Sequence, residues 1–148
     1  MRIVLDTGIL VRATEGSNGP ARQLLLDIVT GPHTLLLCNV ILFEVAKVLR
    51  YPRMLRLHGL SENRIYEFVC FLRDASELVT LDSLLSVPIR DQNDIIVAQT
   101  AMIGDANVIC TMDDDFYDST MVHFLGGLRI TVMDDVALMK KMRAERPR

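Results

Sequence analysis

Acidic residues stand at separate places in the sequence where a fold could bring their carboxylates together. Asp6 directly follows a short apolar run, and the acidic run Asp113–Asp115 follows another. Glu44 interrupts the almost wholly apolar stretch VILFEVAKVL, and Asp91 and Asp94 are spaced three residues apart. Residues with that spacing lie on one face of a helix. Carboxylates gathered at one place repel one another and raise each other's pKa values unless a cation binds between them.

The ligand chemistry of these acids favours a hard divalent cation. Carboxylate oxygens suit Mg²⁺ or Mn²⁺ rather than Zn²⁺, and the sequence has no set of histidines and cysteines that would compete for the ion. Such ions can lower the pKa of bound water and stabilise charge on a phosphate group. The acids therefore indicate metal-assisted cleavage of a phosphodiester bond.

Each acid also has a purely structural interpretation. Asp6 could bond only to loop amides, and the acidic run near residue 114 could be a solvated loop with a capping role. Glu44 could form a surface ion pair with Lys47, although an acid inside an apolar helix is costly unless it is compensated. Asp91 or Asp94 could cap a helix. The metal-site hypothesis therefore depends on the acids taken together.

Short apolar strands alternate with helices along the chain. Strands are predicted at residues 3–5, 34–38, 77–81, 107–111 and 128–132, and helices at residues 21–29, 40–50, 62–75, 92–104 and after 134. Pro20 suits a first helical turn, and Gly104 suits a helix end. N-caps are expected at Asn39, Ser61 and Asp134.

This alternation predicts an α/β fold of three layers (α/β/α), with a central parallel sheet of about five strands covered by helices on both faces. The length suits a single domain, residues 1–148, with one core. In open parallel sheets the ligand site lies at the carboxyl ends of the strands, near the point where the strand order reverses. Asp6 and Asp113–Asp115 follow strands, so both are expected at that edge.

The composition predicts a cytoplasmic protein. No apolar run is long enough to span a bilayer, and the first residues lack the architecture of a signal peptide. Cys38, Cys70 and Cys110 are an odd number without CxxC spacing, which fits buried, inert thiols in a reducing compartment. The net charge of −3 does not favour nucleic-acid binding by bulk charge, but acids that bind metal would leave the working surface less negative.

The order of the acids resembles that of the PIN-domain nucleases, most closely the toxin-type (VapC-like) ribonucleases of toxin–antitoxin systems. The resemblance covers residues 3–132 and rests on Asp6-Thr7, on Glu44 in an apolar helix, on Asp94-Ile-Ile-Val-Ala with Asp91 nearby, and on Thr111-Met-Asp113-Asp-Asp115-Phe116. It implies endonucleolytic cleavage of RNA with Mg²⁺ or Mn²⁺. It also implies a homodimer and a small protein antitoxin as a partner.

Carried over onto this sequence, the resemblance implies that the catalytic, metal-binding acids are Asp6, Glu44, Asp94 and Asp113. Asp115 would be a further metal ligand, and the accessory residues would be Thr7, Asp91 and Thr111. One position departs from the family. Where members often have Asn or Ser two residues after the first Asp, this chain has Gly8, so Thr7 is expected to supply the remaining hydroxyl bonding to Asp6.

Other α/β families fit the sequence less well. A phosphatase of the haloacid dehalogenase type requires a second Asp at the place of Gly8. A receiver domain requires an acidic pair near the first strand and a late lysine, but the candidate lysines here lie only in the terminal helix. A nucleotide-binding domain requires a glycine-rich turn after the first strand, and that spacing is missing. The alternative that stays open is a catalytically silent PIN-like module that binds RNA or a protein partner. Gly8 favours this alternative, and the retention of all the acids disfavours it.

Two further features suggest contacts with partners. Basic residues follow the Glu44 helix and could guide RNA, or could merely complement the helix dipole; they are Arg50, Arg53, Arg56 and His58. The helix at residues 62–75 has apolar groups on more than one side, namely Tyr66, Phe68, Val69, Phe71 and Leu72. One core-facing stripe needs fewer, which fits self-association.

Overall fold

The computed structural model describes residues 1–82 and 85–147, and in these ranges five strands form one parallel sheet in the order β3-β2-β1-β4-β5. The strands are β1 (Arg2–Leu5), β2 (Thr34–Leu37), β3 (Ser76–Leu78), β4 (Val108–Cys110) and β5 (Thr131–Met133). The helices are α1 (Thr7–Val11), α2 (Pro20–Thr30), α3 (Asn39–Leu49), α4 (Pro52–His58), α5 (Glu62–Ala75), α6 (Gln92–Ile103), α7 (Ser119–Gly127) and α8 (Asp135–Ala144), with the 3₁₀ helix η1 (Asp114–Tyr117) before α7.

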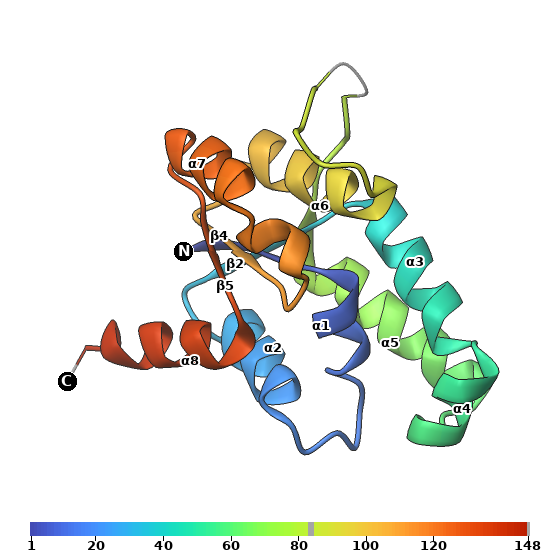
Figure 1. The fold of residues 1–148 in the computed structure, drawn as a ribbon. Helices are drawn as coiled ribbons and strands as arrows, with labels where there is room; N and C mark the ends of the chain where they lie inside the picture. Colours follow the sequence, from blue (N-terminus) through green and yellow to red (C-terminus); the bar gives the residue numbers. More distant parts are fainter. Residues whose placement is uncertain (83–84, 148) are drawn as a thin grey trace.

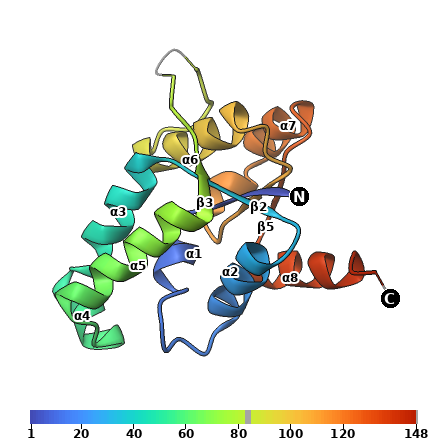
Figure 2. The same ribbon diagram turned by 180° about the vertical axis from the view of Figure 1, so that it is seen from behind.

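Helices cover both faces of the sheet, which confirms the predicted three-layer fold. Helices α6 and α7 lie on one face, and α2, α5 and α8 lie on the other (Figure 1; Figure 2 shows the same layers from behind). The strand residues Ile3–Leu5, Leu35–Leu37 and Val108–Cys110 are all buried. Continuous apolar strands are expected where a parallel sheet is covered on both sides.

The strand order reverses beside β1, at the centre of the sheet. From β1 the chain builds β2 and then β3 on one side, and it returns to place β4 on the other side of β1. The backbone amide of Asp6 donates to the carbonyl oxygen of Cys110 (3.1 Å), so the ends of β1 and β4 are joined. The carboxyl ends of these two strands therefore form the place where a ligand site is expected.

Several local predictions are confirmed, because each depends on one residue's own chemistry. Pro20 is the first residue of α2, and Gly104 ends α6. Ser61 and Asp134 cap α5 and α8 by accepting hydrogen bonds from backbone amides three residues later. Asn39 is the exception, since α3 begins at this residue and the N-cap position belongs to Cys38, which makes no side-chain cap bond.

Two strands were placed inaccurately by the sequence pattern. The strand expected at residues 77–81 is β3 at 76–78, because its neighbour β2 ends at Leu37 and offers no further partner beyond the bond from the Val79 amide. The strand expected at 128–132 begins only at Thr131. Helix α7 runs to Gly127, and Arg129 then takes a left-handed conformation (φ 62°) that no strand accommodates.

Helices α1, α4 and α7 and the 3₁₀ helix η1 were not predicted from the sequence. The three cysteines are free, and Cys70 is partly exposed, contrary to the expectation of fully buried thiols, whereas Cys38 and Cys110 are buried. Within the described ranges, no helix combines the length and the apolar character that crossing a membrane requires.

Candidate metal centre

Three carboxylates converge beyond the carboxyl ends of β1 and β4. Asp94, Asp113 and Asp115 each offer an oxygen, and these oxygens all lie within 4.8 Å of one another. Asp94 lies in the first turn of α6, Asp113 follows β4, and Asp115 belongs to η1. Three hard oxygen donors at this spacing could hold one divalent cation such as Mg²⁺ or Mn²⁺.

Asp94 is the buried member of this group of three. The residue is only 8% exposed, and among the described residues its Oδ2 atom has no hydrogen-bond partner. Burial, together with the charges of Asp113, Asp91 and Asp115, raises the pKa of Asp94 to about 7. A buried carboxylate oxygen without a donor is costly. The orphaned oxygen therefore fits a site that a metal ion would complete.

Asp91 caps α6. Its Oδ1 atom accepts hydrogen bonds from the amides of Asn93 (2.9 Å) and Asp94 (3.3 Å). Asp113 has a similar local role in addition to its place in the group of three, since one of its oxygens accepts from the amide of Asp115 (2.9 Å). The two caps fix the backbone from which Asp94 and Asp115 project.

Asp6 is tied to the same edge through Thr111. The hydroxyl of Thr111, which is fully buried, donates to Oδ2 of Asp6, and the amide of Asp113 donates to that hydroxyl (3.0 Å). The other Asp6 oxygen accepts from the amide of Ile9 (3.0 Å) and so caps α1. Burial raises the pKa of Asp6, while the bonds from Thr111 and Ile9 oppose this shift. The orientation of Asp6 is thus set by residues on two different elements.

The sequence led us to expect that Thr7 would supply the hydroxyl that bonds to Asp6. In the structure this hydroxyl belongs to Thr111. Thr7 makes no side-chain hydrogen bond with any described residue. Tyr117 was not anticipated from the sequence: its hydroxyl donates to the carbonyl oxygen of Thr111 (2.7 Å) and holds that residue in place. The only feature of the sequence that could have pointed to Tyr117 is its position soon after Asp113, because the 3₁₀ turn there carries the chain back over Thr111.

Glu44 is half-buried on α3 and does not belong to the group of three. Within the described part of the chain it has no hydrogen bond or ion pair, so the suggested surface pair with Lys47 does not form. Helix α3 packs against both α1 and α6, the helices that carry Asp6 and Asp94 at their first turns. The role of Glu44 as a metal-site acid stays a prediction.

Gly8 leaves open space beside Asp6. The residue is exposed, and a Cβ atom added at this position would lie 3.4 Å from Oδ1 of Asp6, an ordinary van der Waals contact. The backbone therefore accommodates the Cβ atom that a Ser or Asn at this position would add.

The basic residues proposed to guide RNA lie away from the acids. Arg50 donates to Glu62 on α5 (2.7 Å), whereas Arg53 and Arg56 are exposed on α4. Figures 1 and 2 both show α4 at the far end of α3 from α6. These arginines are therefore not part of the metal centre.

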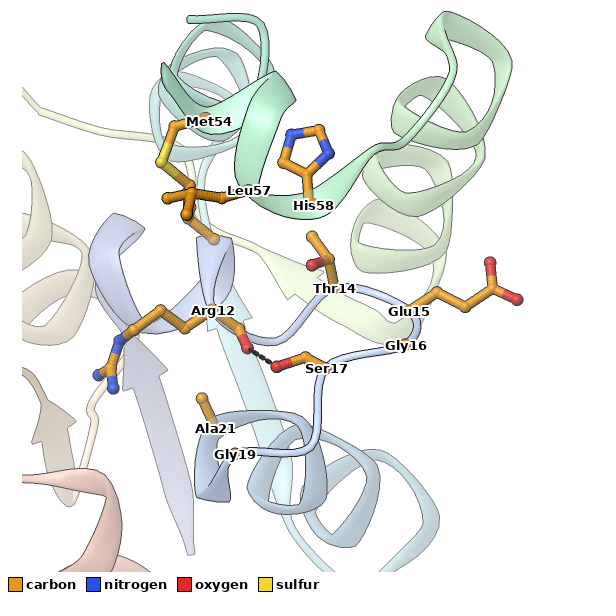
Figure 3. Close-up of a pocket in the computed structure, with 11 residues that line it drawn as sticks. Arg12, Thr14, Glu15, Gly16, Ser17, Gly19, Ala21, Met54, Leu57 and His58 are labelled. Atoms are coloured by element: carbon orange, nitrogen blue, oxygen red, sulfur yellow. Dashed lines mark hydrogen bonds between the residues drawn. The ribbon is translucent and has the colours of Figure 1, made fainter. Parts of the chain in front are cut away.

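A cavity of about 380 Å³ opens between the segment after α1 and helix α4 (Figure 3). Its walls include Thr14, Glu15, Met54 and Leu57, and none of the predicted metal ligands lines it. The carboxylate site at the sheet edge is therefore separate from this cavity.

The match to a known family covers the elements that carry these acids. The family model of the PIN domain matches residues 3–119, from β1 to the start of α7. The chain belongs to the PIN domain family. Members of this family are generally nucleases, so the carboxylate edge of this PIN domain is the place to expect nuclease chemistry.

A solved structure shares the fold of this PIN domain. It is VapBC2 from Rickettsia felis bound to a DNA fragment from their promoter, and it superposes with a TM-score of 0.58 at 13% sequence identity. The match covers 90% of this chain and 98% of that chain, and at this identity it shows a shared fold alone. A comparison with curated proteins finds no match.

Proposed function

We propose that this PIN domain is a divalent-metal-dependent endoribonuclease and the toxin component of a toxin–antitoxin pair. The observation that carries the proposal is the carboxylate of Asp94. It is buried, its Oδ2 has no donor among the described residues, and one of its oxygens lies within 4.8 Å of oxygens of Asp113 and Asp115. A strongly perturbed acid of this kind is typical of functional sites. A silent binding module would have no need to keep three acids so close together.

The side chains divide the work in a simple way. Asp94, Asp113 and Asp115 would hold the ion, and Asp6, aligned by Thr111, would supply a further carboxylate at the same edge, with Glu44 approaching from α3. When bound, Mg²⁺ or Mn²⁺ makes water a better nucleophile and stabilises the charge that develops on the phosphate. Asp91, Thr111 and Tyr117 act by positioning these acids. Thr111 in particular keeps Asp6 Oδ1 turned to the α1 amides and Oδ2 to its own hydroxyl.

We expect the purified protein to cleave RNA only with a divalent ion. Panels of tRNAs and rRNA fragments are incubated with Mg²⁺, with Mn²⁺ or with EDTA, and the products are mapped. Cleavage at defined sites should appear with either ion, disappear in EDTA and return when excess ion is added. Cleavage that persists in EDTA would contradict the metal mechanism, and a folded protein that cuts none of these RNAs with either ion would favour the silent module.

The partners proposed for this nuclease are a small protein antitoxin and a second copy of the chain, acting in the cytoplasm. The shared fold with VapBC2 and the resemblance to toxin-type members support the antitoxin. The free cysteines fit a reducing compartment. Arg53 and Arg56 remain proposed RNA contacts at a distance from the acids.

The homodimer is proposed to form across α3 and α5. Arg50 at the end of α3 bonds to Glu62 at the start of α5, so the two helices run antiparallel side by side. Each has a large apolar side chain in solvent, since Phe43 on α3 is 78% exposed and Tyr66 on α5 is 65% exposed. Exposed aromatic residues on adjacent helices are typical of an interface.

We expect Phe43→Asp to convert the dimer into a monomer. A charge placed at the centre of an apolar interface costs several kcal/mol, or more than about a hundredfold in the dissociation constant. Light scattering coupled to size exclusion at tens of micromolar measures the change. Val122→Asp on α7, where the side chain is also partly exposed, is the matched control and should leave the mass unchanged. A wild-type protein that is monomeric at this concentration would refute the dimer.

A further inference from the structure

Arg12 and Asp135 form an ion pair at the carboxyl edge of the sheet. Neither residue belongs to the proposed metal centre. The Nη1 atom of Arg12 lies 3.4 Å from Oδ2 of Asp135. The side chain of Asp135 is 3% exposed, and that of Arg12 is 45% exposed. Asp135 is the first residue of α8, and Arg12 directly follows α1, the helix that Asp6 caps.

The charge of Asp135 has no other cation to balance it among the described residues. Its Oδ1 accepts only from the amide of Val136 (2.9 Å), and its Oδ2 has no hydrogen-bond partner in the same ranges. A buried carboxylate that loses its only cationic neighbour is strongly destabilised. Asp135 therefore keeps the guanidinium of Arg12 beside the first turn of α8.

Most of the guanidinium of Arg12 has no partner among the residues that the structure describes. Arginine has five N–H donors in a planar fork, and within the described ranges none of those of Arg12 makes a hydrogen bond. Arg12 lines the cavity, and Figure 3 shows its guanidinium extending away from the other labelled side chains. A half-exposed guanidinium with free donors is suited to two-point contact with a phosphate.

The position of Arg12 places its guanidinium at the sheet edge that carries the acids. Strand β5, which leads into Asp135, pairs with β4, which leads into Asp113, and the amide of Thr111 donates to the carbonyl oxygen of Met133 (3.0 Å). The ion pair between Arg12 and Asp135 and the acids therefore lie at the same edge of the sheet. A polynucleotide that approaches the acids is repelled by their charge, and a fixed cation beside them would offset that repulsion.

We propose that Arg12, whose ion-pair partner is Asp135, binds a backbone phosphate of the RNA at the sheet edge that carries the metal centre. The inference rests on the proposed function, since it takes RNA as the ligand. Arg12 contacts a phosphate that flanks the bond to be cut, and it takes no part in proton transfer. The contact depends on the charge and position of the phosphate, so it gives no specificity for particular bases.

The test compares two proteins that differ only at position 12. Removing Arg12 alone would leave the buried Asp135 charge without compensation, so the comparison is Asp135→Asn against the double variant Arg12→Gln/Asp135→Asn. Both also carry Asp94→Asn, which is expected to block cleavage during the measurement. Binding to a labelled single-stranded RNA of mixed sequence is measured by fluorescence anisotropy at several NaCl concentrations with Mg²⁺ present.

Loss of one phosphate contact should reduce the slope of log K against log[NaCl] by about 0.7 for a single strand. We therefore expect the double variant to show the shallower slope and Asp135→Asn to keep the slope of its Asp94→Asn parent. Arg143→Gln, which removes a charge from the exposed side of α8, is the control and should also keep it.

Equal slopes for the two proteins, with native circular dichroism, would overturn the proposal and leave the ion pair as a tie between α1 and α8. Absence of RNA binding at low salt would overturn it too. Cleavage by the wild-type protein is measured separately. If the wild type cleaves RNA and the two slopes are equal, only the role of Arg12 is refuted. If the slopes differ but the wild type does not cleave RNA, the proposed nuclease activity is refuted and the phosphate contact stands.

Discussion

Replacing Asp94 with Asn is expected to lower the rate of RNA cleavage by at least about a hundredfold while the protein stays folded. Changing residues that merely support a metal ligand costs about 10- to 100-fold in affinity or activity, so loss of a ligand's charge should cost at least as much. Asp6→Asn should have an effect of the same order. Asparagine preserves the shape of both side chains and the N-cap bond that Asp6 makes to α1.

The control for this prediction lies in the same acidic run. Asp114 stands between Asp113 and Asp115 but is exposed and outside the group of three carboxylates. Asp114→Asn should therefore keep most of the activity, although it removes the same charge from the same loop. The measurement compares the initial rates of the wild type and of each variant on one mapped RNA substrate over a range of Mn²⁺ concentrations. Full activity of Asp94→Asn would show that the metal centre has been placed incorrectly.

The second large effect concerns stability and pH. Because the pKa of Asp94 is raised from 3.8 to about 7, the folded protein binds more protons than the unfolded chain between these values. The metal-free protein should therefore lose stability as the pH rises from about 4 through about 7, and it should stay at the lower value above this window. An asparagine side chain carries no charge at any pH, so the variant Asp94→Asn should lack this loss.

Thermal melts in EDTA should then show the inactive variant to be the more stable protein at pH 8. We expect its melting temperature to exceed that of the wild type by several degrees, since about 1 kcal/mol corresponds to a few degrees for a chain of this size. The difference should shrink as the pH falls towards 4. A variant that melts below the wild type at pH 8 would assign Asp94 a structural role.

Metal should offset the stability advantage of Asp94→Asn. An ion at about a hundred times its dissociation constant adds roughly 2.7 kcal/mol to the stability of the wild type at pH 8. Asp94→Asn, which lacks one ligand charge, should gain much less from the same Mn²⁺ concentration. Equal gains for the two proteins would mean that Mn²⁺ binds elsewhere.

The parts of the fold that could be predicted are those set by local chemistry. The central strands were identifiable because they are short, apolar and covered on both faces, as Ile3–Leu5 illustrates. Ser61 and Asp134 were identifiable as caps because a cap needs only its own side chain and an amide three residues on. The end of β3, by contrast, depends on where β2 ends, and a local pattern carries no such information.

The same distinction applies to the metal centre. Asp91 and Asp94 are equivalent in the sequence, yet one caps α6 in solvent and the other is buried beside Asp113, because only packing decides which side of the first turn faces inward. The hydroxyl beside Asp6 could not be assigned correctly either. Thr7 is its neighbour in the chain, but Thr111 is its neighbour in space through the pairing of β1 with β4.

The open space at Gly8 has a consequence for how the catalytic rate of the proposed nuclease can change. A serine there would place its Cβ in van der Waals contact with Oδ1 of Asp6 and bring a hydroxyl near that oxygen, and such supporting bonds strengthen metal sites. The turnover rate can therefore rise or fall by a single substitution that leaves every metal ligand in place. In the proposed toxin, a slower enzyme would widen the range of antitoxin supply over which the cell survives.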